Sequence, residues 1–312
     1  MGKKNKTKEY DVLILGAGMA GLTAGLYAAR YNLKTIIVSK DIGGTGNIAG
    51  HVENWPGFDG AGIDLMKKVI EQVKKLGVDF LQGETVRVEK DKIGFFVEVG
   101  GEVVHGKSLI VALGMQHRKL NIPGEKEFLG KGVSYCATCD GMFFKNKIVA
   151  IVGGGDSASR AANYLSTLTK KVYLIHRGEE FKFSPMCLER VKEKKNVESI
   201  LNSIITEIKG DKKVSKILVS SIDGKSKKEI DVDGVFIEIG AVPVLEVVKP
   251  LGLALDQGGF IITDKNSKTN VEGVFAAGDA TNSSLKQLSV SAGEGAIAAK
   301  EAYDYLRFRY KK

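Results

Sequence analysis

The chain has few cysteines and no long hydrophobic segment. Its 312 residues include three cysteines and four histidines. Three cysteines cannot form a disulfide framework, so the fold must depend on buried apolar side chains, and a chain of this length that is 43% hydrophobic can form two globular domains. No apolar run approaches the length that spans a bilayer, and the lysine-rich segment 1–9 lacks the apolar core of a signal peptide. These absences predict a cytoplasmic protein with no membrane partner.

The formal charge of +9 raises the question of a nucleic-acid partner. A basic surface attracts phosphate whatever its shape. Here the excess is spread over surface lysines and gathers only in the short segments 3–6 and 307–312, with no binding motif beside them. We therefore expect no nucleic-acid partner.

Two of the three cysteines form a CxxC motif. Cys136 and Cys139 enclose Ala137-Thr138, and Asp140 follows directly. Two thiols at this spacing close a small disulfide with little backbone movement, and the motif lowers the pKa of one thiol. A half zinc site is the alternative, but it needs further ligands near by, and only Cys187 and scattered histidines remain. The motif therefore predicts a redox-active pair in a reducing compartment.

A strand, a glycine-rich turn and a helix follow one another twice. In the first copy an apolar segment, 10–15, leads into Gly16-Ala17-Gly18-Met19-Ala20-Gly21 and a helical stretch to Arg30. In the second, segment 148–152 leads into Gly153-Gly154-Gly155-Asp156-Ser157-Ala158 and a helical pattern through Leu165 and Leu168. Further apolar strands follow at 35–38 and 172–175. Such turns admit a pyrophosphate at a helix N-terminus, so the fold class is α/β with two Rossmann-like domains and two dinucleotides.

The two copies predict a discontinuous first domain. Segments around 116–121 and 240–243 read as connections between two halves. We therefore expect one domain formed by 1–115 with 247–312, and a second domain, 116–246, inserted into it.

A Gly-Asp pair near the C-terminus is a further candidate for ligand binding. Gly278 and Asp279 follow the apolar segment 274–277 and precede a helical stretch, 289–305. The glycine permits close approach, and the carboxylate can accept hydrogen bonds from sugar or ribityl hydroxyls; a simple turn with a helix cap is the alternative.

Four segments together carry a family resemblance. Residues 52–57, 136–141, 153–158 and 273–279 occur in the order and spacing of the low-molecular-weight thioredoxin reductases, and the resemblance covers nearly the whole chain. It implies a homodimer that passes electrons from NADPH through FAD to the dithiol and on to thioredoxin or a glutaredoxin-like protein.

The resemblance also implies roles for particular residues. Cys139 would lie against the flavin, Cys136 would attack the substrate disulfide, and Asp140 would be the acid-base group. Rotation of the inserted domain would let the dithiol and the nicotinamide reach the flavin in turn. The implied FAD residues are Gly16, Gly18, Gly21, Gly43, Gly44, Asn54, Gly278, Asp279 and Gln287. The implied NADPH residues are Gly153, Gly155, Ala158, Arg177 and Lys182.

The chain departs from the family at several positions. Thr45, Leu113 and the triplet Lys286-Gln287-Leu288 differ from the usual flavin contacts. After the second-domain strand 172–175, where these enzymes usually show His-Arg-Arg and a later arginine, the chain reads His176-Arg177-Gly178-Glu179-Glu180-Phe181-Lys182. Arginines at these positions form forked hydrogen bonds with the 2′-phosphate of NADPH. Because this chain has Gly178 and Lys182 in their place, we expect weak NADPH binding with little preference over NADH. A flavin reductase or redox carrier with a non-nicotinamide donor is the alternative. The histidines at 51, 105 and 117 have no ligand spacing and read as surface or loop residues.

Overall fold

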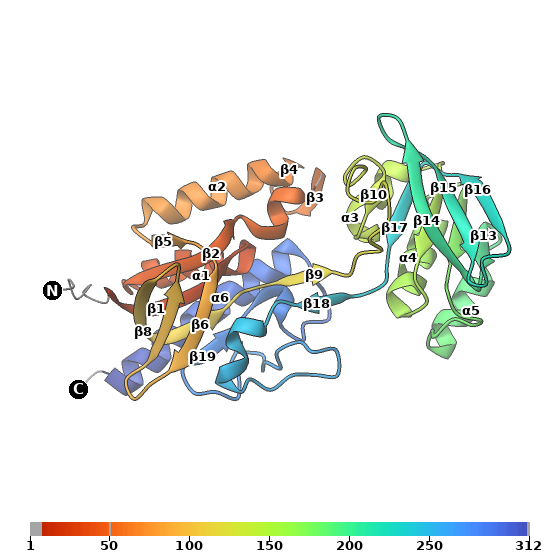
Figure 1. Cartoon of the computed structure of the whole chain (residues 1–312). Helices are drawn as coiled ribbons and strands as arrows, with labels where there is room; N and C mark the ends of the chain where they lie inside the picture. The colour runs from red at the N-terminus through yellow and green to blue at the C-terminus, as the bar shows by residue number, and fades with distance from the viewer. Residues whose placement is uncertain (1–7, 50, 311–312) are drawn as a thin grey trace. The chain divides into compact units, whose positions relative to one another are not determined.

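The structure, a computed structural model, describes residues 8–49 and 51–310 and divides into two compact units (Figure 1). Unit 1 joins Met1–Gln116 to Val242–Lys312, and unit 2 is His117–Ala241. The chain passes between the units in β9 (Met115–His117) and β18 (Ala241–Pro243), which pair with each other. Both strands lie at the segments where the sequence predicts connections.

Unit 1 contains a mixed sheet with strand order β5-β2-β1-β8-β7-β6, and β19 also pairs with β8. β1, β2, β5, β8 and β19 run parallel, whereas β6, β7 and β8 pair antiparallel. The bounds are β1 (Lys8–Ala17), β2 (Thr35–Ile42), β5 (Asp79–Gln82), β6 (Thr85–Lys90), β7 (Phe95–Val99), β8 (Glu102–Val111) and β19 (Val274–Ala276).

Both faces of this sheet are covered. Alternate residues of a strand point to opposite faces, so Val12 and Ile14 of β1 pack with the helices, and Leu13 and Leu15 pack with side chains of β6, β7 and η3. In Figure 1 helix α1 lies beside α6. The remaining elements of unit 1 are α1 (Met19–Arg30), η1 (Gly44–Ile48), β3 (His51–Trp55), β4 (Phe58–Ala61), α2 (Gly62–Lys75), η3 (Glu246–Leu251), η4 (Gly278–Ala280) and α6 (Leu288–Tyr310).

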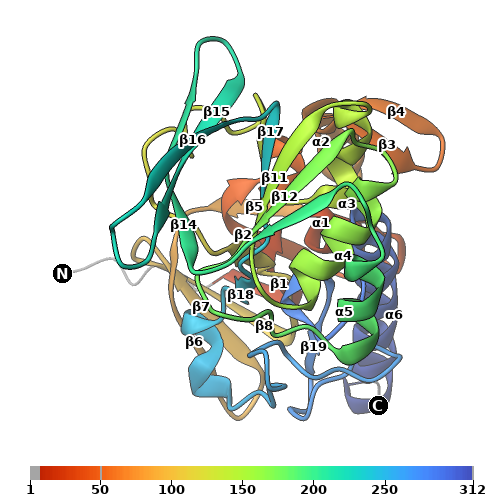
Figure 2. The ribbon, with the colours of Figure 1, turned by 90° about the vertical axis from the view of Figure 1, so that its right-hand side faces the viewer.

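Unit 2 is built on a parallel sheet, β10-β17-β11-β12-β13, with different layers on its two faces (Figure 2). Val149 and Ile151 of β11 pack against α4, whereas Ala150 and Val152 pack against the sheet β14-β15-β16. The bounds are β10 (Val133–Ser134), α3 (Ala137–Asp140), η2 (Gly141–Phe144), β11 (Ile148–Val152), α4 (Asp156–Ser166), β12 (Lys171–Ile175), α5 (Pro185–Lys192), β13 (Val197–Ile200), β14 (Ser203–Gly210), β15 (Val214–Ser221), β16 (Lys227–Asp231) and β17 (Gly234–Ile237).

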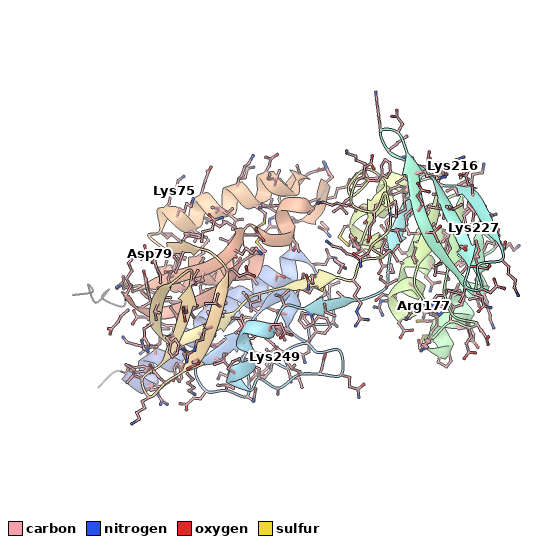
Figure 3. All side chains as sticks on the ribbon, viewed as in Figure 1. Lys75, Asp79, Arg177, Lys216, Lys227 and Lys249 are labelled. Carbon is pink, nitrogen blue, oxygen red and sulfur yellow. A yellow bond between two sulfur atoms is a disulfide. The ribbon has the colours of Figure 1, made fainter. Side chains whose placement is uncertain are left out.

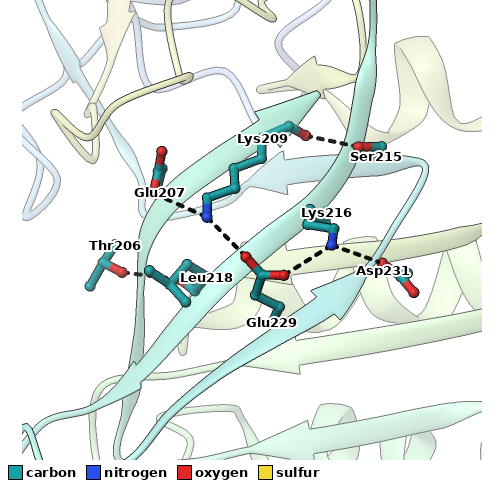
Figure 4. A network of polar contacts seen from close by, with 8 residues as sticks. All are labelled: Thr206, Glu207, Lys209, Ser215, Lys216, Leu218, Glu229 and Asp231. Atoms are coloured by element: carbon teal, nitrogen blue, oxygen red, sulfur yellow. Dashed lines mark hydrogen bonds and ion pairs between the residues drawn. The ribbon is translucent and has the colours of Figure 1, made fainter. Parts of the chain in front are cut away.

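The outer surface of β14-β15-β16 carries an ion-pair network (Figure 4). Glu229 accepts hydrogen bonds from Lys209 and Lys216, each at 2.9 Å, and these two lysines lower the pKa of Glu229 to about 2. Glu229 therefore stays ionised at neutral pH and links the three strands. Because the pairs are exposed to solvent, their contribution to stability is small.

The secondary structure corrects two expectations. The helical pattern was expected to run through Leu168, but helix α4 ends at Ser166. Leu168 lies in the following turn, and its N–H donates to Leu165 O at 3.0 Å. His51, His105 and His117 lie in strands β3, β8 and β9 and not in loops. His51 is exposed at the surface, as expected, whereas His105 and His117 are partly buried. The side chain of His105 is only 14% exposed and its Nε2 lies 3.1 Å from Asp91 Oδ2. No helix in the described part of the chain is long and apolar enough to cross a membrane.

Candidate active site

The CxxC motif forms a disulfide at the start of a short helix. Cys136 precedes α3 and is bonded to Cys139, with a Cα–Cα distance of 5.3 Å. The N–H of Cys139 lies 3.2 Å from Cys136 Sγ, and the Thr138 hydroxyl lies 3.4 Å from the same sulfur. Upstream, the Ser134 hydroxyl accepts the N–H of Cys136 at 3.0 Å. Donors aimed at Cys136 Sγ would stabilise a thiolate there after reduction.

Asp140 is the last residue of α3 and is partly buried beside the disulfide. Its N–H donates to Cys136 O at 3.1 Å. Burial raises the pKa of Asp140, and a hydrogen bond with Ser134 opposes that rise. A carboxyl with a raised pKa can hold a proton closer to neutral pH than an exposed one, which suits exchange of protons with thiols.

Two apolar side chains beside the dithiol are exposed, and the sequence reading missed them. Phe144 anchors η2 by packing on Phe236, with ring centroids 5.1 Å apart. The preceding Met142 and Phe143 remain 47% and 43% exposed. Their signal in the sequence is the apolar run 142–144 directly after the motif. Such side chains beside a dithiol can contact a protein substrate.

The second glycine-rich turn has open space where a nucleotide would approach. Gly155 caps α4, and a Cβ built on it meets nothing within 4 Å. A Cβ on Gly153 would lie 2.3 Å from Glu238 O and 2.9 Å from the Cβ of buried Ala158. Gly153 and Ala158 therefore permit close packing of strand and helix, while Gly155 leaves the backbone accessible.

The loop after β12 folds back onto this turn. The N–H of Lys182 donates to Gly154 O at 2.7 Å. The His176 ring lies between two glycines, because a Cβ on Gly154 would be 2.1 Å from it and a Cβ on Gly178 would be 2.7 Å from it. The side chains of Lys182 and Arg177 are exposed, Arg177 at the surface of unit 2 (Figure 3).

Glu238 is a partly buried carboxyl that the sequence analysis does not predict. It follows β17, and its N–H donates to Val152 O at 2.8 Å. Burial raises the pKa of Glu238 to about 7, against the opposing effects of the Ala137 N–H and the Arg160 charge. The Glu238 carboxyl therefore lies at the start of α3, and its backbone O lies against Gly153, a proximity that only the tertiary fold creates.

In unit 1 the first glycine-rich turn has the same organisation. A Cβ on Gly16 would lie 2.2 Å from Ala112 O, and one on Gly21 would lie 1.9 Å from Gly16 O. Gly18 caps α1, and a Cβ there meets nothing within 4 Å. Tight packing at the outer glycines and open space at the middle one fit a bound pyrophosphate.

Other expected flavin residues of unit 1 form two sets of contacts, one at this turn and one between Asn54 and Gln287. The N–H of Gly43 donates to Ala17 O at 2.8 Å, and a Cβ on Gly44 would lie 3.2 Å from Gly18 Cα. Asn54 Nδ2 donates to Gln287 Oε1 at 2.8 Å. The loop 43–44 thus borders the glycine-rich turn, and Asn54 is joined to the residue preceding α6.

Gly278 packs against α1, the helix that follows the first glycine-rich turn, and Asp279 contacts α6. Gly278 has a positive φ of +79°, and a Cβ on it would lie 2.8 Å from the Cβ of Ala20. The Ser291 hydroxyl lies 3.5 Å from Asp279 Oδ1. Burial raises the pKa of Asp279; the Lys286 charge opposes that rise and the Glu294 charge adds to it. A partly buried carboxylate beside this turn fits hydrogen bonding to nucleotide hydroxyls.

The comparisons with known proteins agree on one family. Residues 10–295 match the pyridine nucleotide-disulphide oxidoreductases. The thioredoxin reductase of Listeria innocua is 40% identical over 306 residues, which cover 97% of this chain and 95% of the relative. The thioredoxin reductase of Bacillus subtilis is 38% identical over 307 residues, covering 97% and 96%. The crystal structure of thioredoxin reductase from Streptococcus pyogenes has a TM-score of 0.92 at 36% identity and covers 97% of this chain and 100% of that one. The chain therefore belongs to the thioredoxin reductases of the pyridine nucleotide-disulphide oxidoreductase family.

Proposed function

We propose that this protein is a thioredoxin-disulfide reductase that takes electrons from a nicotinamide cofactor. The disulfide between Cys136 and Cys139, in the same unit as a glycine-rich nucleotide turn, is the observation that supports this function most directly. FAD would bind to the set in unit 1 and the nicotinamide cofactor to the set in unit 2. Bound FAD would supply a relay that accepts a hydride and delivers two electrons to a disulfide.

The dithiol would reduce its substrate in two exchange steps. The Cys136 thiolate attacks one sulfur of the substrate disulfide, forming a mixed disulfide and releasing one substrate thiolate, which takes a proton. The Cys139 thiolate then attacks Cys136 Sγ, releases the second substrate thiolate and restores the Cys136–Cys139 disulfide. Two electrons pass to the substrate, and Asp140 supplies a proton to a leaving thiolate. The exposed Met142 and Phe143 would contact the redoxin, either thioredoxin or a glutaredoxin-like protein.

Residues assigned to the flavin lie in unit 1, whereas the dithiol and the nicotinamide turn share unit 2. We infer that unit 2 rotates about β9 and β18, so that each of the two reaches the flavin in turn. We also propose a homodimer that works in the cytoplasm. Light scattering of the purified protein tests the homodimer, and fractionation of cells tests the location.

A yellow holoprotein is expected. Gly18→Val should weaken FAD binding, because the side chain would enter the space left for the cofactor without a clash in the apoprotein. Overpacking of this kind costs about 1–3 kcal/mol, or about 5- to 150-fold in affinity. Flavin absorbance and fluorescence measure the bound fraction.

The matched control for Gly18 is Gly155, which caps α4 with the same open space. Gly155→Val should keep FAD and lose nicotinamide binding. A colourless wild-type protein that cannot be reconstituted with FAD would contradict the proposed function.

Asp140→Asn is expected to reduce thioredoxin turnover by roughly 100-fold, the scale of general acid-base catalysis. Burial raises the pKa of Asp140, so its acid form persists to higher pH than that of an exposed aspartate and is lost as pH rises through the raised pKa. Wild-type turnover should therefore fall on the alkaline side, and the variant should lack that limb. Asp211→Asn, an exposed position in the same unit, is the control. An unchanged pH profile in Asp140→Asn would assign the proton transfer elsewhere.

A further inference from the structure

Glu294 of α6 holds the turn that carries Asp279. Its Oε2 accepts the backbone N–H of Gly278 at 2.7 Å and the Thr281 hydroxyl at 3.3 Å. Gly278 and Thr281 are both buried and stand at the two ends of the turn η4. One carboxylate oxygen from α6 therefore ties both ends of this turn. Without it, a buried N–H would lose its acceptor.

Close packing fixes where this carboxylate lies. Gly295 follows Glu294, and a Cβ on Gly295 would be 2.2 Å from Ala20 O of α1. A Cβ on Gly278 would be 2.8 Å from the Cβ of the same alanine. Helix α6, the turn η4 and helix α1 therefore interlock at Ala20. Because α1 begins directly after Gly18, the Glu294 contacts fix the Gly-Asp turn relative to the first glycine-rich turn.

The charges around Asp279 come from α6 and from the segment before it. The negative charge of Glu294, on α6, raises the pKa of Asp279, and the positive charge of Lys286 lowers it. Lys286 Nζ donates to Thr281 O and lies over the Phe260 ring. Burial lowers the pKa of Lys286, while Asp279, Glu294 and Asp256 oppose that shift. Ser291 is the neutral partner of Asp279 on α6.

We propose that Glu294 is a positioning residue for FAD, whose carboxylate holds the Gly278–Asp279 turn in the shape in which Asp279 meets the nucleotide. This inference rests on the proposed assignment of FAD to unit 1. Glu294 does not itself need to touch the cofactor. Its role would be exerted through Gly278 and Thr281.

The test compares FAD release from the holoprotein of wild type, Glu294→Ala and Glu294→Gln, followed by the rise in flavin fluorescence on dilution. Glu294→Ala should weaken FAD binding by roughly 10-fold, because a hydrogen bond to a charged acceptor is lost. Glu294→Gln presents an amide oxygen to the same two donors, so it should stay within about threefold of wild type. The control is Glu301→Gln on the same helix, a residue that forms ion pairs with Lys268 and Lys300 and contributes no hydrogen bond to Gly278 or Thr281. It should leave FAD affinity unchanged even if the melting temperature falls.

A pH series separates positioning from loss of structure. Asp279 becomes protonated as pH falls through its raised pKa, and Glu294 contributes to that rise. Removing this charge in Glu294→Gln should therefore lower the pKa of Asp279. The acid limit, which is the pH below which the protein releases FAD, should then move to lower pH. This comparison does not need Glu294→Ala to fold.

Three outcomes would overturn the inference. These are wild-type affinity in Glu294→Ala, an equal loss in Glu301→Gln, and a Glu294→Gln variant as weak as the alanine variant. An acid limit that does not move in Glu294→Gln would also count against it. A wild-type protein that binds no FAD would instead overturn the proposed function, and this inference with it.

Discussion

Cys136→Ser and Cys139→Ser should both reduce thioredoxin turnover to background, yet they should differ in colour. With Cys136 replaced, the Cys139 thiolate remains to perturb the flavin, and a long-wavelength charge-transfer band is expected. With Cys139 replaced, the band should be absent. The expected difference follows from the proposed roles, in which Cys139 would exchange electrons with the flavin and Cys136 would attack the substrate disulfide. Absorbance spectra and turnover assays of the two variants measure both effects.

Cys187→Ser is the control for this pair, because Cys187 is the free cysteine and lies in α5. It should keep both turnover and spectrum. If the band disappears with Cys136 and survives the loss of Cys139, the two roles are reversed. Disulfide reduction that persists in the double serine variant would exclude this dithiol as the reductant.

The electron donor is expected to be NADPH or NADH with little preference between them. Gly178 occupies the position at which the family usually has its second arginine. Losing a charged, forked contact to the 2′-phosphate costs roughly 1.5–3 kcal/mol, or about 10- to 150-fold in affinity. Arg177 and Lys182 remain exposed on the loop and can still meet a phosphate. Lys182→Met should therefore weaken NADPH and leave NADH unchanged. Steady-state kcat/KM values for both donors measure this difference.

The structure adds a reason why Gly178 cannot simply become arginine. A Cβ at this position would lie 2.7 Å from the His176 ring, which also stacks on Phe181 with centroids 5.7 Å apart. Burial lowers the pKa of His176, and the Arg177 and Lys182 charges add to that shift, so the ring is neutral at pH 7 and brings no charge to a phosphate. We expect Gly178→Arg to restore less NADPH preference than a forked contact would supply.

A strong preference for NADPH at micromolar concentration would contradict this account of Gly178. Reduction by a non-nicotinamide donor, with none by NADPH or NADH, would favour the alternative function, a flavin reductase or redox carrier. The three donors should therefore be assayed side by side with the same preparation. The Gly155→Val variant is the control for binding at the second glycine-rich turn.

Much of the fold follows from short-range patterns. The apolar segment 148–152 is strand β11 to the residue, and the helix expected to end at Arg30 is α1. The CxxC spacing likewise places its two sulfurs within reach of each other, as the disulfide confirms. These features are local, because backbone preference and side-chain spacing act within a few residues. The predicted end of α4 was wrong, because an apolar pattern of helical spacing can continue into a turn that follows the helix.

The sequence by itself determined the two glycine-rich turns, the dithiol and the α/β class, because each depends on residues that are neighbours along the chain. Only the tertiary structure decided what surrounds them. Glu294 reaches Gly278 from 16 positions away along the chain, and Glu238 comes to the turn at Gly153 through the order of strands in a parallel sheet. His176 lies between Gly154 and Gly178 because a loop folds back onto its own sheet. Such contacts depend on how strands and helices pack, and no local spacing encodes them.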